Sequence, residues 1–197
     1  MSKNNQYLGG RLPLLDPKVL SSDQRDLYQR LDKTMISWAM ATGFQGKTED
    51  GCLIGPFNPI LYSPGISTAF MGLHDAEEAH TSIDEQVRQV VILAVGSVWG
   101  TDYERYAHAA AARKAGLSDD AIAALSAGRK PANLSEPALI AVNFAHELSA
   151  QHAVSDDTYR AAVGAFGEKG IVDLTFLIGI YHIVCGLLNV VQAPVPE

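Results

Sequence analysis

An apolar run near the C-terminus constrains the fold of this chain more than any other feature. It reads LTFLIGIYHIVCGLLNVV and extends from Leu174 to Val191. Its length just reaches the minimum for a bilayer-spanning helix, but it contains His182 and Asn189 and lacks the basic flank that anchors a membrane helix. We therefore predict no membrane partner and a helix that is buried on every side, in the core or against a second subunit.

The rest of the chain also carries helix signals. A capping residue or a proline precedes each segment in which apolar residues recur at helical spacing. These start signals are Ser21–Asp23, Pro64, the pair Ser82 and Glu85, the pair Thr101 and Glu104, Ser118, Ser135 and Ser155. Glycines predict the ends of several helices, at Gly43, Gly116, Gly128 and Gly167. No alternating strand pattern with hairpin turns is present, so the sequence predicts an all-α fold with about eight helices.

The length of 197 residues fits a single domain, residues 1–197. Residues 1–20 precede the first clear helix signal, and we expect them to form an N-terminal extension. Residues 44–65 are rich in glycine and proline, which predicts a long irregular loop. Loops of that length inside a compact domain are usually functional or fold over another part of the chain.

The charge balance excludes broad classes of partner. There are 22 acidic and 15 basic residues, which give a net charge of −7. Nucleic acids and anionic membranes attract basic surfaces, so we expect neither as a partner. Cys52 and Cys185 lie too far apart for a CxxC pair or a zinc cluster, and the N-terminus has no apolar signal segment. These features favour a cytoplasmic protein.

The stretch WGTDYERYAHAAAARKAGLS holds the strongest candidate for chemistry. Glu104 and His108 are four residues apart, so they lie on one face of the predicted helix. A carboxylate beside an imidazole raises its proton affinity and determines which ring nitrogen carries the proton, as a general acid/base requires. Alternatively, Glu104 is the capping-box partner of Thr101, and His108 is a core histidine with one hydrogen bond.

Aromatic residues and possible metal ligands surround this pair in the sequence. Trp99 and Tyr103 either line a pocket or fill the core or a subunit interface. The segment LHDAEEAH contains one Glu-x-x-His motif, Glu77 to His80, but a di-iron bundle needs two such motifs. A solvated polar helix end therefore explains this segment better. No zinc motif or phosphate-binding loop is present, so we expect neither a metal nor a cofactor.

The run VRQVVILAVGSVWGTDYERYAHAAAARKAGLSDDAIAALSAG resembles the core of the carboxymuconolactone decarboxylase family, which is related to the alkylhydroperoxidases. The resemblance covers about residues 53–190 and rests on the apolar helix, the Tyr-Glu-then-His core and the AGLSDDAI turn. It implies an alkylhydroperoxidase-like helical fold that forms a homo-oligomer, often a trimer or hexamer. It also implies an active site near a helix pair, often close to a subunit boundary.

The resemblance also assigns roles to single residues. Alkylhydroperoxidases carry CxxC, three residues and then the histidine, and these cysteine positions correspond to Thr101 and Glu104. Disulfide-based peroxide reduction by the usual route is therefore excluded. The decarboxylase branch has Tyr-Glu followed by His, as Tyr103, Glu104 and His108 do. Family members generally have a glutamate after an arginine in the upstream helix, where this chain has Arg88 and Gln89. Because Gln89 cannot carry a proton, Glu85, one turn earlier, is a candidate substitute.

The resemblance thus implies a cofactor-independent acid/base enzyme, a carboxy-lyase that decarboxylates or isomerises a small cyclic carboxylic acid or lactone in the breakdown of aromatic compounds. His108 would donate the proton, and Glu104 would orient the imidazole ring of His108. Tyr103 or Trp99 would shape the pocket, with Arg88 and Gln89 as further substrate contacts, although Arg88 is equally a candidate for a salt bridge on the surface. One alternative is a hydroperoxide-handling protein that uses Cys52 or Cys185. Another is a non-catalytic oligomeric binding protein.

Overall fold

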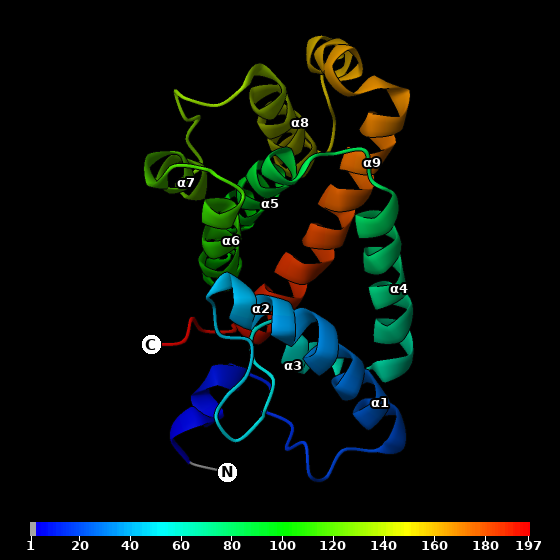
Figure 1. Cartoon of the computed structure of the whole chain (residues 1–197), viewed down its shortest axis with the longest axis vertical. Coiled ribbons are helices and arrows are strands. Elements are labelled where there is room, and N and C mark those ends of the chain that lie inside the picture. Colours follow the sequence, from blue (N-terminus) through cyan, green and yellow to red (C-terminus); the bar gives the residue numbers. More distant parts are fainter. Residues whose placement is uncertain (1–2) are drawn as a thin grey trace. The chain divides into compact units, whose positions relative to one another are not determined.

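The computed structural model describes residues 3–197, and these residues are helical apart from loops and one isolated bridge between Lys47 and Leu53 (Figure 1). In chain order the elements are the 3-10 helix η1 (Lys3–Gly9), α1 (Ser22–Leu31), the π-turn η2 (Asp32–Ile36), α2 (Ser37–Thr42), α3 (Phe57–Ile60), α4 (Pro64–His80), α5 (Glu85–Trp99), α6 (Asp102–Lys114), α7 (Asp119–Ser126), α8 (Glu136–Gln151) and α9 (Asp156–Val191). Because α1, η2 and α2 are continuous, eight helical segments follow η1 in the part of the chain described. The prediction of an all-α fold with about eight helices is confirmed.

The chain divides into two compact units. The first unit contains Met1–Asp75 and Gly186–Glu197, and the second contains Ala76–Cys185. The six candidate site residues from the sequence, His108, Glu104, Tyr103, Trp99, Arg88 and Gln89, all belong to the second unit.

In the first unit, the segment 44–65 is folded rather than open. It contains the short helix α3, and Cys52, Leu53 and Ile54 within it are almost fully buried. The side chain of Asn58 accepts a hydrogen bond from the Leu15 amide and donates one to the Pro13 carbonyl, at 3.1 Å each. The segment therefore packs on the N-terminal residues, as a long glycine- and proline-rich loop inside a compact fold is expected to do.

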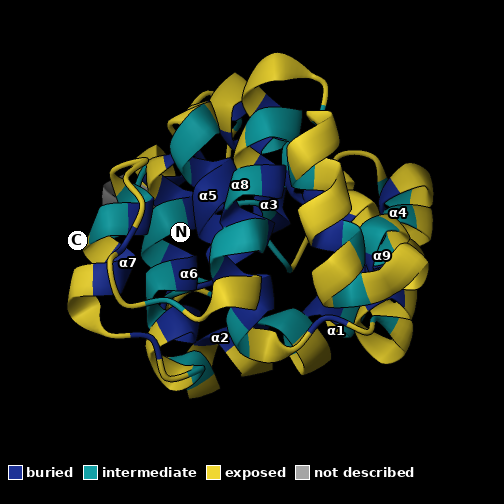
Figure 2. Ribbon diagram, turned by 90° about the horizontal axis from the view of Figure 1, so that it is seen from above, coloured by how far each residue is buried: buried dark blue, intermediate teal, exposed yellow. Residues whose placement is uncertain are grey.

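In the second unit, α5 is the central helix. It contacts α6, α7 and α8, and its residues from Val87 to Gly96 are all buried, as the dark blue colouring in Figure 2 shows. A helix surrounded in this way must be apolar on nearly every side, which explains the sequence VVILAV in its middle. Any polar side chain on this part of α5 must find its partner inside the protein.

The predicted helix boundaries are mostly confirmed. Ser21, Ser118 and Ser135 each accept a hydrogen bond from the first turn of the helix that follows. The prediction for Ser82 is wrong, because Asp84 caps α5 by accepting from the Val87 amide at 2.9 Å. The amide and hydroxyl of Ser82 instead donate to Asp173 in α9, at 2.7 Å each.

The apolar C-terminal run lies in α9. A break at Gly167 (φ 69°, ψ 178°) interrupts the helix at the predicted position. After the break, one face is buried, whereas Val172, Phe176 and Ile183 are 52%, 51% and 48% exposed. One chain therefore buries only part of this helix, and burial of the remaining face against a second subunit stays a prediction. Within the described residues, α9 is also the one helix that is long and apolar enough to cross a bilayer, a test that core helices pass as well.

The exposed apolar residues of α9 form a stripe. Val172, Phe176, Gly179 and Ile183 follow one another at intervals of four, three and four residues, the spacing of a helix–helix seam. Gly179 would allow a second helix to approach closely, since an added Cβ there would meet no atom within 4 Å. We predict that this stripe is a contact between copies of the chain.

Replacing Phe176 with glutamate should shift the protein from an oligomer towards the 21.1 kDa monomer, because the contact would then bury an unpaired carboxylate. Size-exclusion chromatography with light scattering at micromolar concentration measures the mass. Ala123→Glu, on the exposed side of α7, is the matched control and should leave the mass unchanged. A monomeric wild-type protein at this concentration would contradict the prediction.

Candidate functional site

The candidate site lies where α5 and α6 meet in the second unit. Gly100 adopts a left-handed conformation (φ 65°) that ends α5, and Thr101 begins α6 directly afterwards. The helices pack closely because Gly96 faces Glu104. A Cβ added to Gly96 would lie 3.4 Å from Cγ of that glutamate. This packing places the face of α6 that carries Glu104 and His108 against α5.

The two polar residues of the predicted pair are buried together. Glu104 is 2% and His108 6% exposed, and Nε2 of His108 lies 3.1 Å from Oε1 of Glu104. The capping-box alternative for Glu104 is wrong, because Thr101 makes no side-chain capping hydrogen bond to α6. Glu104 thus turns towards the imidazole and away from the start of its own helix.

Gln89 on α5 determines the tautomer of His108. Nδ1 of His108 lies 2.8 Å from Oε1 of Gln89, an oxygen that can only accept. The amide group of Gln89 is oriented by its own Nε2, which donates to Oε1 of Glu85 at 2.7 Å. Nδ1 must therefore carry a hydrogen, and in the neutral ring Nε2 is left as an acceptor facing Glu104. Glu85 lies behind Gln89 and acts on His108 through it.

This arrangement requires one proton between His108 and Glu104. Either the carboxylic acid donates to Nε2, or the imidazolium donates to the carboxylate. Burial raises the pKa of Glu104 to about 8, so the pair retains this proton at neutral pH. Although Nε2 lies 3.1 Å away, Oε1 of Glu104 is buried without meeting the geometric criteria of a hydrogen bond. The pair is thus a neutral, proton-bearing unit with unused hydrogen-bonding capacity.

Tyr181 of α9 completes one side of the site, and sequence reasoning did not select it. Its ring stands edge-on to the His108 ring, with centroids 5.1 Å apart at an angle of 88°. Burial raises the pKa of Tyr181, and the charges of both Arg88 and Glu104 act on its hydroxyl. The phenol therefore remains protonated, within the electrostatic reach of both groups.

Arg88 forms a buried ion pair with Glu77. Its Nη1 lies 2.6 Å from Oε1 of Glu77, and the two side chains are only 6% and 3% exposed. The alternative of a surface salt bridge for Arg88 is thus wrong in its location, because the ion pair is buried. Nη2 of Arg88 is also buried and has no partner. Glu77 is buried too, so the prediction of a fully solvated helix end at residues 73–80 is wrong at this residue. Over residues 3–197, no group of three or more metal-binding side chains occurs.

The predicted aromatic residues separate into two places. Tyr103 is 1% exposed and packs edge-on against Tyr106, with ring centroids 5.8 Å apart. Trp99 is 37% exposed, and its ring is tilted by 48° against the ring of His182, with centroids 5.6 Å apart. Nε2 of His182 lies 2.9 Å from the hydroxyl of Ser149. Burial lowers the pKa of His182, which favours the neutral ring in this hydrogen bond with Ser149. Trp99 therefore contacts His182, whereas Tyr103 contacts Tyr106.

A thiol also lies beside the candidate pair. Cys185 of α9 is fully buried, and its sulfur is hydrogen-bonded to the side chain of Thr101. Burial raises the pKa of this thiol, and the nearby charge of Glu104 raises it further. Cys185 follows Tyr181 by one helical turn on the buried face of α9. That i, i+4 pattern was the available sequence signal for both residues.

The comparisons with known proteins agree with the resemblance drawn from the sequence. Residues 64–147 match the model of the carboxymuconolactone decarboxylase family, which confirms that resemblance for the segment that holds the candidate pair. No curated protein matches the chain.

Solved structures share the fold at low sequence identity. A peroxidase-related protein from Ralstonia eutropha JMP134, with an alkylhydroperoxidase AhpD core, has a TM-score of 0.74 and 16% identity over 96% of this chain and 93% of its own. A putative antioxidant defence protein AhpD from Agrobacterium tumefaciens has a TM-score of 0.65 and 18% identity over 71% of this chain and 97% of its own. The debrominase Bmp8, in complex with 2,3,4-tribromopyrrole, has a TM-score of 0.70 and 16% identity over 95% of this chain and 94% of its own. These likenesses confirm the alkylhydroperoxidase-like fold.

The shared proton predicts a specific dependence of stability on pH. In the unfolded chain, Glu104 loses its proton near pH 4.5 and His108 near about pH 6.5. Above about pH 6.5, the unfolded chain has a neutral imidazole and a carboxylate, so neither group holds its titratable proton. The folded pair keeps one such proton up to about pH 8. The free energy of unfolding should therefore fall by about 2 kcal/mol as the pH rises from about 6.5 to 8.

Urea unfolding at several pH values measures this effect. In Glu104→Gln the fall should disappear, because the neutral amide can donate to Nε2 at every pH in this range. Glu136→Gln, at the exposed start of α8, should keep the wild-type profile. Parallel profiles for wild type and Glu104→Gln would show that the pair does not hold an extra proton.

Proposed function

We propose, from the premise that residues 64–147 carry the carboxymuconolactone decarboxylase family segment, that this chain is a cofactor-independent acid/base enzyme. It would decarboxylate or isomerise a small cyclic carboxylic acid or lactone. The observation that carries the proposal is the buried, proton-bearing pair of His108 and Glu104, oriented by Gln89. A buried group that keeps a proton near neutral pH is suited to return that proton to a carbon atom.

Decarboxylation would use this proton in its last step, the protonation of the ring carbon. The bond between the ring carbon and the substrate carboxylate breaks, carbon dioxide leaves, and the electron pair moves onto the lactone carbonyl oxygen as a dienolate. The proton shared by His108 and Glu104 then passes from Nε2 of His108 to the ring carbon, and water returns a proton to the pair. Isomerisation would need the same group to remove a proton from one carbon and return it to another.

The neighbouring side chains would stabilise the charge that develops. Nη2 of Arg88 is a buried donor without a partner, and it would hold the substrate carboxylate or the dienolate oxygen. The Tyr181 hydroxyl, which the charges of both Arg88 and Glu104 influence, would donate to the same oxygen. Tyr103 would support the wall of the site through its packing. We further propose that the enzyme works in the cytoplasm as a homo-oligomer on a small-molecule substrate.

The surroundings of the thiol favour acid/base chemistry over hydroperoxide reduction. A peroxide-reducing cysteine must be available as a thiolate. Cys185 is buried, and both its burial and the charge of Glu104 raise its pKa, which disfavours the thiolate. The hydroxyl of Thr101 and the carboxyl of Glu104 stand at the positions that the family's redox branch gives to cysteines.

Replacing His108 with glutamine, and separately Glu104 with glutamine, should each lower turnover by about 100-fold or more, the contribution typical of a positioned proton donor. A panel of carboxylated γ-lactones serves as substrate, with release of carbon dioxide as the readout. His80→Gln, an exposed histidine at the end of α4, is the matched control and should retain full activity. Full turnover in both folded variants would refute the acid/base proposal. The absence of turnover of any panel member in the wild type would favour a non-catalytic binding protein.

A second measurement separates the hydroperoxide alternative. We expect Cys185→Ser and Cys52→Ser to retain decarboxylation and the wild type to lack thiol-dependent peroxidase activity, because serine preserves the size and hydrogen bonding of each side chain. Peroxidase activity with cumene hydroperoxide and dithiothreitol is measured in parallel. Activity in the wild type that disappears in either serine variant would establish the redox alternative instead.

A further inference from the structure

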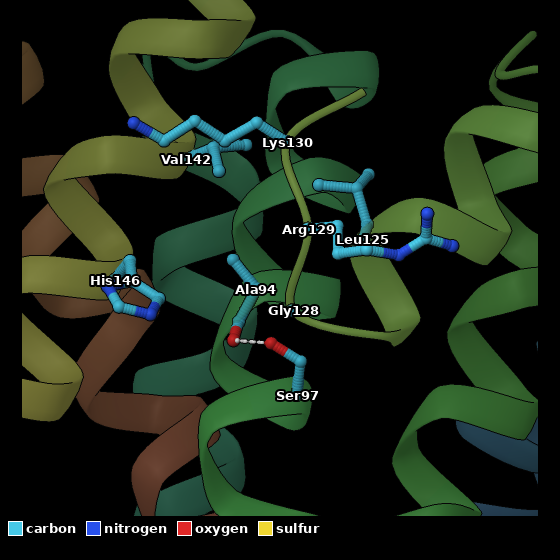
Figure 3. Close-up of a pocket in the computed structure, with 8 residues that line it drawn as sticks. All are labelled: Ala94, Ser97, Leu125, Gly128, Arg129, Lys130, Val142 and His146. Carbon is cyan, nitrogen blue, oxygen red and sulfur yellow. Dashed lines mark hydrogen bonds between the residues drawn. The ribbon is translucent and has the colours of Figure 1, made fainter. Parts of the chain in front are cut away.

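A pocket lies in the same unit, and its lining does not include the candidate pair. It is formed by α5, α7, α8 and the turn after α7, and its volume is about 190 Å³ (Figure 3). Its lining residues are Ala94, Ser97, Leu125, Gly128, Arg129, Lys130, Val142 and His146. None of them takes part in the proton arrangement of His108, Glu104 and Gln89.

The inner part of this pocket is apolar. Ala94, Leu125 and Val142 contribute methyl groups from three different helices, and each of these residues is buried. The one hydroxyl among the lining residues belongs to Ser97, and it donates to the Ala94 carbonyl at 2.7 Å. Its hydrogen is therefore already committed, so the inner surface suits a carbon skeleton better than a polar one.

The mouth of the pocket carries basic side chains. In Figure 3, the Lys130 side chain runs across the mouth towards α8, and the His146 ring lies on the same side, whereas Arg129 extends the other way. Neither Lys130 nor Arg129 forms an ion pair with any described residue of the chain. The nearby carboxylate of Glu147 is occupied by the Ser155 amide at 2.8 Å and the Thr158 hydroxyl at 2.6 Å. These hydrogen bonds and, to a smaller extent, the charge of Lys130 lower the pKa of Glu147. An ammonium has three donors, so Lys130 can still donate to an anion at the mouth.

The backbone holds these basic residues in a defined place. Gly128 adopts a left-handed conformation (φ 68°) at the end of α7, and the Arg129 amide donates to the Ala124 carbonyl at 2.8 Å. This is the standard glycine end of a helix, in which the last carbonyls are satisfied by the turn. The turn continues into Pro131, which is buried and has a restricted backbone. The backbone of this turn is thus fixed, so only the exposed side chains of Arg129 and Lys130 lose freedom on binding.

We propose that this pocket binds a small organic monocarboxylate with a single apolar ring. The ring would lie against Ala94, Leu125 and Val142, and the carboxylate would accept hydrogen bonds from Lys130 and His146. A volume of about 190 Å³ is smaller than the roughly 300 Å³ at which pockets for drug-sized ligands begin, which limits the ligand to about one ring. Free phosphate would match the ammonium but leave the apolar wall unused. This inference does not depend on the proposed function.

Benzoate is the probe that tests the site. Titration into protein with labelled methyl groups should shift the methyl resonances of Ala94, Leu125 and Val142, and calorimetry supplies the dissociation constant. Lys130→Gln should weaken binding about fivefold, the value of one exposed charged contact. Ser97→Phe should block binding by filling the pocket, provided that circular dichroism shows the native helix content. Lys33→Gln, at an exposed residue of η2 in the first unit, is the control and should bind as the wild type does.

Three comparisons can overturn the proposal. If benzamide binds as tightly as benzoate, the carboxylate is not recognised. If inorganic phosphate binds as tightly, the apolar ring contributes nothing to binding. Benzoate that leaves the three methyl resonances unchanged, or that loses affinity only in His108→Gln, would place its binding elsewhere. Binding that persists in His108→Gln and is lost in Ser97→Phe supports the proposal, whatever the outcome for the catalytic pair.

Discussion

The site depends on one constraint, the need of Gln89 to satisfy a polar amide in the middle of a buried helix. The two polar atoms of the Gln89 amide have opposite requirements: the nitrogen must donate a hydrogen bond and the oxygen must accept one. Glu85 supplies the acceptor one turn away on α5, and His108 supplies the donor from α6. Because these two demands are met together, the ring of His108 has one orientation and one tautomer. Everything that Glu104 can do with a proton follows from that choice.

Local signals predicted much of this structure. The serine caps, the glycine helix ends and the shared face of Glu104 and His108 depend on residues within four positions of one another, and they are present in the fold. Ser82 is a position at which the local sequence does not predict the capping residue. Two capping residues, Ser82 and Asp84, were available for α5, and the outcome depends on Asp173, 91 residues further along the chain. No spacing rule contains that contact.

The contributions of α9 were inaccessible for the same reason. The i, i+4 spacing of Tyr181 and Cys185 places both on one face of this helix, but the apolar run does not say that this face meets the candidate pair. The same ambiguity concealed the exposed stripe with Phe176. Arg88 was recognised as either an anchor or an ion-pair partner, and the structure contains the ion pair together with one uncommitted nitrogen.

Gly96 gives the site a mechanical sensitivity. Because Gly96 has no side chain, Glu104 packs directly over its backbone. The Cβ of an alanine at this position would lie 3.4 Å from Cγ of Glu104, in van der Waals contact. A branched side chain would act as a wedge between the two helices and lengthen the path between Nε2 and Oε1. The strength with which the pair holds its proton could thus be tuned in evolution or by design through a residue that carries no charge and donates no side-chain hydrogen bond.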